Sequence, residues 1–483
     1  MKKILTKISI VAASALVFVG CEAIDPTDVV NPNLSESALV GQPNSSQSWL
    51  NGIERQLAVA ANNNLLVAEI VSDNYVNTQT FFNQFMDGLT IDFQDDDVDD
   101  SQFHIARMRE MALFGLTEIG PNDPNYDSGI QAEFEFFAGL SHLWAAMYYR
   151  ALPGETAGPV LDRTAHLDAA INYFQLAKAN YDDAGNDNTG ASLALARAYY
   201  LKGDAANAVA SADAAIASGP DYLRVIKFDP QNSRGNSNSN NYTVNSLQDA
   251  IYDRGSFDDL QPLPKLDFLD PKYSLVSATA DADIPLLKIE EAYLIKAEAA
   301  NAGGNDPGAL TALTDLFTLI ATREVRSISD AAEDRTERAP KSRPDSTDIT
   351  VNGTAGLVLY RQGANIDVPA VSGTSYDAAM LAGLTGDAML EAIYNIRQEV
   401  FIAEGIRSMD MGITFVVSQN EQLLNSNVST SDTEPDIPPF LASISTEIDA
   451  ITYDDVARTC TITHDITALI VANKGSNYVC PFH

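Results

Sequence analysis

A helical repeat in the middle of the chain constrains the fold more than any other feature. From residue 192 to residue 220, small and aromatic residues recur at helical spacing on both sides of a glycine: Leu195, Ala196, Tyr199, Gly203, Ala208, Ala212 and Ala215. This register is typical of a tetratricopeptide repeat, in which small residues let two helices approach closely and Pro220 would end the second helix. A weaker copy uses the same kinds of residue: Tyr293, Ala297, Ala300, Gly304, Ala309 and Leu313.

The repeats predict a mainly α fold with little β structure. We expect helices at roughly 47–71, 101–119, 130–150, 166–184, 189–217 and 286–322. The first two segments would form one helix pair and the next two a second, whereas each of the last two would hold a complete pair. About four tetratricopeptide-like pairs would then build a right-handed scaffold. Loop insertions at 221–285, 327–387 and 413–483 would form a long capping region, and such loops are where binding usually resides.

The N-terminus reads as an export signal. Lys2, Lys3 and Lys7 precede an apolar run over residues 8–19, which is too short to span a bilayer comfortably. We therefore predict a cleaved signal peptide over residues 1–20. Gly20 and Cys21 follow the run and resemble the lipobox of bacterial lipoproteins, which predicts lipidation of Cys21 and membrane attachment by a lipid anchor only. The alternative is an ordinary signal peptide with an incidental cysteine.

The charge balance excludes one class of partner. The chain carries 66 acidic and 30 basic side chains, for a net charge of -36. Such a surface repels phosphate backbones, so we expect no nucleic-acid partner. Acidic, lysine-poor composition also suits high external salt, where screening weakens self-repulsion. We therefore predict a halophilic protein whose melting temperature rises with NaCl.

Motifs for catalysis and for metal binding are missing from the sequence. It has no nucleophile elbow, zinc-protease motif, phosphate loop or dinucleotide fingerprint, so we expect no enzyme and no cofactor. A lipid-anchored glycosidase stays an alternative, because sequence spacing does not reveal the gap between two carboxylates. The acidic run 92–100 has the carboxylates of a calcium-binding site, but it lacks the turn glycine and terminal glutamate of an EF-hand loop. This absence favours a solvated acidic loop.

Two cysteines remain near the C-terminus. Cys460 and Cys480 would lie in an oxidising compartment after export. We therefore predict a disulfide between them, worth about 3 kcal/mol if unstrained.

Three segments together resemble the SusD/RagB family of outer-membrane nutrient-binding lipoproteins. They are the lipobox with its acidic leader, 21–32; Asp270 to Tyr273 followed by the helix 285–299; and the segment 397–411. The third departs from the family pattern at Val400 and at Ser408–Met409. The resemblance covers the mature chain, 21–483, as a single SusD-like domain. In the third segment Glu404, Arg407 and Asp410 stand at near-helical spacing, so we expect them to fix the fold rather than touch a ligand.

The resemblance implies a non-catalytic role at the cell surface. Family members cover a SusC-like TonB-dependent transporter in the outer membrane and capture oligosaccharides, or in some members peptides, before import. A purely structural repeat scaffold with a protein partner is the remaining alternative.

Candidate ligand residues are expected in the loops. Sugar recognition combines aromatic faces with a few polar anchors. One segment around Tyr75 and another around Tyr252 supply that mixture. For these two tyrosines, packing in the core is an equal alternative to ligand binding. The candidate ligand-binding residues are Asp73, Asn74, Tyr75, Asn77, Phe82, Tyr252 and Arg254.

Overall fold

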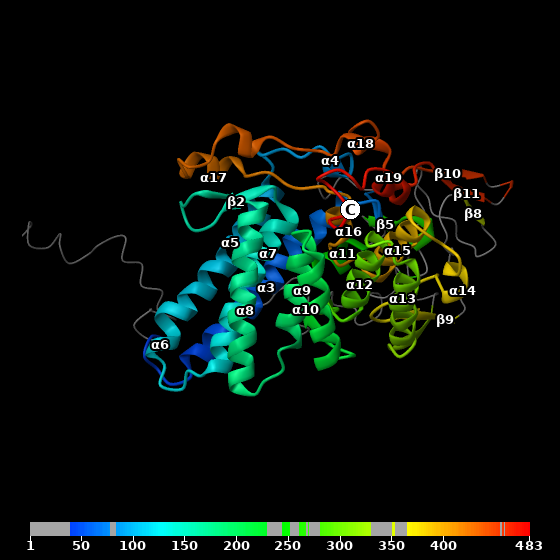
Figure 1. The fold of residues 1–483 in the computed structure, drawn as a ribbon. Coiled ribbons are helices and arrows are strands. Elements are labelled where there is room, and N and C mark those ends of the chain that lie inside the picture. Colours follow the sequence, from blue (N-terminus) through cyan, green and yellow to red (C-terminus); the bar gives the residue numbers. More distant parts are fainter. Residues whose placement is uncertain are drawn as a thin grey trace, which may run out of the picture.

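Helices dominate the architecture, as the sequence predicts (Figure 1). The computed structural model describes residues 39–77, 84–228, 244–251, 260–266, 269, 281–329, 350–352, 365–454, 456–457 and 459–483. Within these ranges the strands are short and form five small sheets of two or three strands each. The predicted mainly α class with little β is therefore confirmed.

Four helix pairs form the scaffold. The first is α3 (Ser45–Ile70) on α5 (Asp96–Phe114), and the second is α7 (Ser128–Tyr148) on α8 (Arg163–Ala184). The third and fourth are α9 (Thr189–Leu201) on α10 (Ala205–Ser218) and α12 (Glu290–Ala302) on α13 (Asp306–Ile320). Each pair also packs on the next through α5–α7, α8–α9 and α10–α12 contacts, so the pairs stack in chain order.

Alanine explains the close packing of the third pair. The buried residues of α10 are Ala208, Ala212 and Ala215, so the helix offers its neighbours a stripe without bulky side chains. Gly203 separates α9 from α10 with a φ of 76°, a left-handed conformation that glycine adopts without strain. The alanine spacing that predicted this helix pair is therefore the spacing of the residues that α10 buries.

The acidic run 92–100 starts a helix rather than forming a loop. The Asp95 carboxylate accepts a hydrogen bond from the Asp97 N–H and caps α5, and Asp96, Asp97 and Asp99 occupy the first turn. Carboxylates are favoured there because the helix N-terminus is positive. In the described ranges no group of three or more His, Cys, Asp or Glu side chains is placed to hold a metal ion. The run therefore has a helix-capping role.

Short elements occupy the regions predicted as loops. β1 (Tyr75–Asn77) pairs with β5 (Leu260–Pro262), β2 (Ala151–Pro153) with β3 (Val160–Asp162), and β4 (Leu223–Ile226) with β6 (Ile284–Lys288), all antiparallel. β7 (Val325–Ser329) pairs with β9 (Asn365–Pro369), and β11 (Thr459–Ile462) lies between β8 (Thr350–Asn352) and β10 (Ile451–Asp454). The predicted segment 286–322 thus opens with a strand, β6.

The remaining helices of the described residues lie between and after the helix pairs. They are α4 (Gln84–Asp87), α6 (Gly120–Asn122), α11 (Ser246–Ile251), α14 (Ala378–Leu381), α15 (Asp387–Val400), α16 (Arg407–Asp410), α17 (Gln419–Leu424), α18 (Pro439–Ala442) and α19 (Ile466–Ala472). α4, α17, α18 and α19 lie along one edge of the helix pairs, at the top of Figure 1. A π-helical turn, Gly115–Ile119, joins α5 to α6.

Charged residues of β6 and α12 form buried ion pairs. The Arg197 guanidinium donates two hydrogen bonds to Glu291, at 2.7 and 2.8 Å, and so joins the third helix pair to the fourth. The Lys288 Nζ lies 2.7 Å from Glu404 Oε1, and both side chains are buried. These carboxylates and cations are neutralised inside the protein, as buried charges must be.

The segment after α15 is fixed in the same way. The Arg397 guanidinium donates to both carboxylate oxygens of Asp410, at 3.1 and 2.9 Å. The Arg407 guanidinium donates to both oxygens of Asp73, at 2.5 and 3.0 Å, across 334 positions of sequence. This pairing agrees with the expectation that Glu404, Arg407 and Asp410 fix the fold.

The predicted disulfide is wrong. Cys460 and Cys480 are both free and buried. Cys460 lies in β11, whereas Cys480 lies next to Tyr394 and Glu298 in the core of the helix pairs. Burial raises the pKa of Cys460 to about 11 and that of Cys480 to about 12, so both stay protonated thiols. The two cysteines are close in sequence but pack in different parts of the protein.

Residues 1–38, with the predicted signal peptide and Cys21, lie outside the described residues. Among the helices that the structure does describe, none has the combination of length and apolarity needed to cross a membrane.

Candidate functional site

Four of the predicted ligand residues lie inside the protein. Asp73 is held by Arg407, and the Asn74 amide donates to Glu69 Oε2 at 2.8 Å. Tyr75 is 1% exposed, and Asn77 is buried as well. Burial alone would raise the pKa of Asp73, but the positive charges of Arg407 and Lys265 outweigh it and lower that pKa.

Strand pairing of β1 with β5 holds Tyr75 and Asn77 in place, and Arg407 and Glu69 hold the side chains of Asp73 and Asn74. Buried side chains offer no surface to a ligand, so Asp73, Asn74, Tyr75 and Asn77 are corrected to structural residues. The remaining candidates, Phe82, Tyr252 and Arg254, lie outside the described residues and stay predictions.

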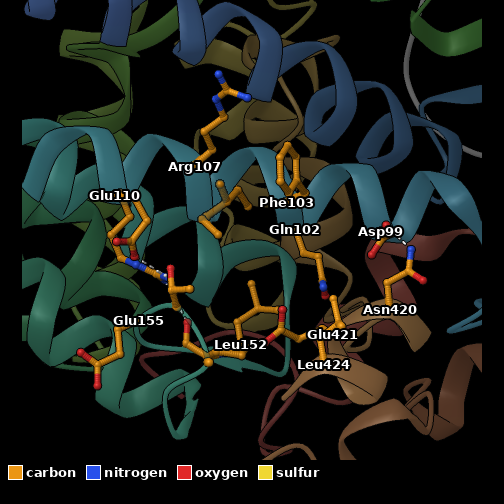
Figure 2. Close-up of a pocket in the computed structure, with 16 residues that line it drawn as sticks. Asp99, Gln102, Phe103, Arg107, Glu110, Leu152, Glu155, Asn420, Glu421 and Leu424 are labelled. Carbon is orange, nitrogen blue, oxygen red and sulfur yellow. Dashed lines mark hydrogen bonds and ion pairs between the residues drawn. The ribbon is translucent and has the colours of Figure 1, made fainter. Parts of the chain in front are cut away.

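An open pocket lies between the first helix pair and the capping region. Its volume is about 640 Å³, within the range of small-ligand sites. One wall is α5, the second is the β2–β3 hairpin and the third is α17 (Figures 1 and 2).

Hydrogen bonds attach α17 to α5. The Asn420 amide donates to Asp99 Oδ2 at 2.7 Å, and the two side chains face each other in Figure 2. The Ser418 hydroxyl donates to Asp99 Oδ1 at 2.5 Å, and the Gln102 amide donates to Ser418 Oγ at 2.8 Å. Two residues one turn apart on α5 therefore position the third wall.

The hairpin is attached in a similar way. The Asn425 amide donates to Gly158 O at 2.9 Å and the Asn427 amide donates to Ala157 O at 3.1 Å. Ala157 has a φ of 53°, a left-handed conformation that is strained for alanine. Such strain tends to concentrate at functional sites, where surrounding contacts hold it in place.

A buried arginine lies at the base of the pocket. Arg109 is 2% exposed, its Nη1 donates to Pro153 O at 2.9 Å, and its Nη2 lies 3.5 Å from Glu110 Oε1. Burial lowers the pKa of Arg109, while the negative charges of Glu110, Glu421 and Glu155 oppose that effect. The guanidinium thus links α5 to the hairpin in an acidic setting.

Apolar side chains stand at the open side of the pocket. Phe103 of α5 is 52% exposed and Leu424 of α17 is 83% exposed. Ring carbons beside carboxylate and amide groups suit a sugar, whose apolar face stacks while its hydroxyls form hydrogen bonds. No histidine, serine or cysteine lines this pocket in the part of the chain that the structure describes.

A second hollow, of about 720 Å³, is lined by α3, α7 and β4. Its aromatic rings, Phe137 and Phe228, are buried and present no open face. The pocket on α5 is the stronger candidate for this reason.

Sequence reasoning missed this pocket. Its walls come from three segments, and α17 is too short to show a periodic pattern. The one local signal was Phe103, which stands between polar residues on the solvent side of a helix.

The stacked helix pairs with their capping elements define a SusD-like fold. The chain is similar to a SusD superfamily protein from Bacteroides fragilis, at 15% identity over 80% of this chain and 99% of that chain, with a TM-score of 0.53. It is also similar to a SusD-like carbohydrate binding protein from Bacteroides vulgatus, at 14% identity over 82% and 99% of the two chains, with a TM-score of 0.52.

A SusD superfamily protein from Parabacteroides distasonis matches at 11% identity over 80% and 98% of the two chains, with a TM-score of 0.52. No protein-family model and no curated protein matches the sequence. At these identities the similarity shows the fold, and the SusD-like fold is the one that the sequence motifs predicted.

Proposed function

We propose that the protein captures oligosaccharides at the cell surface without catalysis. The observation that carries this proposal is the SusD-like fold, which it shares with a structure described as a carbohydrate binding protein. The pocket between α5, the β2–β3 hairpin and α17 supports it, because it combines the exposed ring of Phe103 with polar side chains.

Attachment and delivery belong to the same proposal. Lipidation of Cys21 would hold the protein on the outer membrane, and the resemblance to SusD/RagB lipoproteins supports a SusC-like TonB-dependent transporter as the partner that receives the ligand. Substitution Cys21→Ser should release the protein from membranes. Co-purification of the lipidated chain with an outer-membrane transporter tests the partner.

Glycan binding is tested by isothermal titration against a panel of oligosaccharides. Phe103→Ala should weaken binding about tenfold, since loss of one stacking contact is worth roughly 1.4 kcal/mol. Phe85→Ala is the matched control, because Phe85 lies on α4, is also exposed and does not line the pocket. Loss of binding in the Phe85 variant alone would move the site to α4.

Peptide capture is the second candidate within the same fold. Titration with a peptide digest, in competition with the oligosaccharides, separates the two ligands. Binding of peptides and of no glycan would overturn the proposal.

A further inference from the structure

A small cavity lies between the start of α8, the end of α9 and the C-terminal segment. Its volume is about 10 Å³, close to the minimum that one water molecule needs, so it holds a single small occupant. It is lined by the first residue of α8, the last two residues of α9, one residue of α15, two residues of α16 and residues 478–481. Because the cavity is so small, these residues all lie close to whatever occupies it.

Arg163, the first residue of α8, brings a positive charge to this cavity. Its Nε is buried and has no hydrogen-bond partner in the part of the chain that the structure describes. Burial lowers the pKa of Arg163, and no carboxylate of the described residues opposes that effect. A buried charge is costly unless it is paired. The guanidinium therefore lacks a counter-ion from the described chain.

Two backbone N–H groups add further donors at the same place. Val479 and Cys480 both line the cavity and are buried. Within the described ranges neither of their N–H groups donates a hydrogen bond, which is rare for buried backbone. The ring of Phe482 packs edge-on against Tyr200, with centroids 5.1 Å apart, and so holds this end of the chain on α9 (Figure 1). The cavity is therefore rich in unused donors.

The buried carboxylates beside the cavity are already engaged. Asp410, which also lines it, accepts two hydrogen bonds from Arg397. The hydroxyl groups of Tyr200 and Tyr394 lie 2.8 and 3.3 Å from the two carboxyl oxygens of Glu298. Burial raises the pKa of Glu298 to about 7, so this carboxyl is mostly protonated in weakly acidic solution. The uncompensated charge at the cavity is therefore positive.

We propose that this cavity binds a chloride ion as the counter-ion of Arg163. Chloride is only slightly larger than water, and it accepts hydrogen bonds from a guanidinium and from backbone N–H groups alike. It also neutralises a charge that a water molecule would leave in place. The ion would connect the start of α8 to the C-terminal segment, so that stability depends on chloride itself as well as on ionic strength. This site is separate from the pocket on α5 and does not rest on the proposed function.

The first test separates chloride binding from the screening of charges. Thermal melts in weakly acidic buffer at constant ionic strength replace sodium gluconate, whose anion is too large for the cavity, with sodium chloride. The melting temperature should rise by about 1–2 °C when chloride is in about tenfold excess over its dissociation constant, and the rise should saturate. Screening depends on ionic strength and not on the identity of the anion. Equal melting temperatures in the two salts would therefore overturn the inference.

A substitution assigns the effect to this cavity. Arg163→Met removes the charge and the donors but keeps a long side chain, so the response to chloride should disappear. Arg107→Met is the control, because Arg107 is exposed and lies outside the cavity, and this variant should keep the full response. A chloride response in Arg163→Met as large as that of the wild type would contradict the assignment.

Bromide provides a test that needs no substitution. It replaces chloride in halide sites and scatters X-rays anomalously. Crystals of the wild-type protein grown in sodium bromide should show an anomalous peak in the cavity, beside the guanidinium of Arg163. A cavity that holds only a water molecule, without an anomalous peak, would overturn the inference even if the Arg163→Met variant does not fold.

Discussion

The buried pair between Asp73 and Arg407 offers the sharpest test of the structure. Asp73→Asn keeps the size of the side chain and removes its charge, so the Arg407 guanidinium keeps its position without its counter-charge. Both side chains are buried, and their atoms lie 2.5 and 3.0 Å apart. Loss of one partner of such a pair destabilises a protein by about 3–5 kcal/mol.

This free energy converts to a measurable change in melting temperature. With an unfolding entropy of about 2 cal/mol/K per residue, the melting temperature of a chain this long should fall by roughly 3–5 °C. Differential scanning calorimetry measures it. The control is Asp183→Asn, an exposed aspartate of α8, which should change stability by less than about 0.5 kcal/mol.

A double substitution checks that the effect belongs to the pair. Asp73→Asn combined with Arg407→Met removes both charges, so the double variant should be less destabilised than the sum of the two single variants. The reasoning is refuted if Asp73→Asn melts at the wild-type temperature and loses glycan binding instead. That result would return Asp73 to the ligand-binding role predicted from the sequence.

Three further predictions follow from buried and surface groups. Burial lowers the pKa of His142 to about 3 and that of His166 to about 4, so protons bind the unfolded chain first and stability falls as pH drops from about 6.5 toward 4. In the His142→Asn variant the melting temperature should fall less steeply as pH is lowered. A pH dependence equal to that of the wild type would contradict this prediction. The melting temperature should rise with NaCl, and a flat or falling trend removes the halophilic prediction. In a Cys21→Ser variant, Cys460 and Cys480 should react with a thiol reagent only after denaturation, and a mass consistent with a disulfide would contradict the structure.

The helix pairs were predictable because their determinants are local. The alanines of α10 and the glycine before it lie within about one repeat of each other, and helical periodicity brings the alanines onto one face without help from distant residues. The same locality explains why short strands such as β4 and β6 were missed. Their pairing joins segments far apart in sequence, and neither alone has a clear period.

The ligand residues were misjudged for a related reason. Asp73 and Tyr75 lie in a polar, aromatic segment that looks like a binding loop when read alone. Only the fold shows that Arg407, 334 positions away, neutralises Asp73. The pocket was missed because Phe103, Glu155 and Glu421 come from three separate segments. A charged residue indicates a binding site only when the residues around it in the fold are known.

The Asp73–Arg407 pair also sets an order of events during synthesis. A ribosome adds about 5–20 residues per second, so Arg407 emerges on the order of tens of seconds after Asp73. Until then Asp73, which follows α3, lacks its counter-charge, and this part of the native core cannot close. The core around Asp73 is therefore completed only after most of the chain has been synthesised.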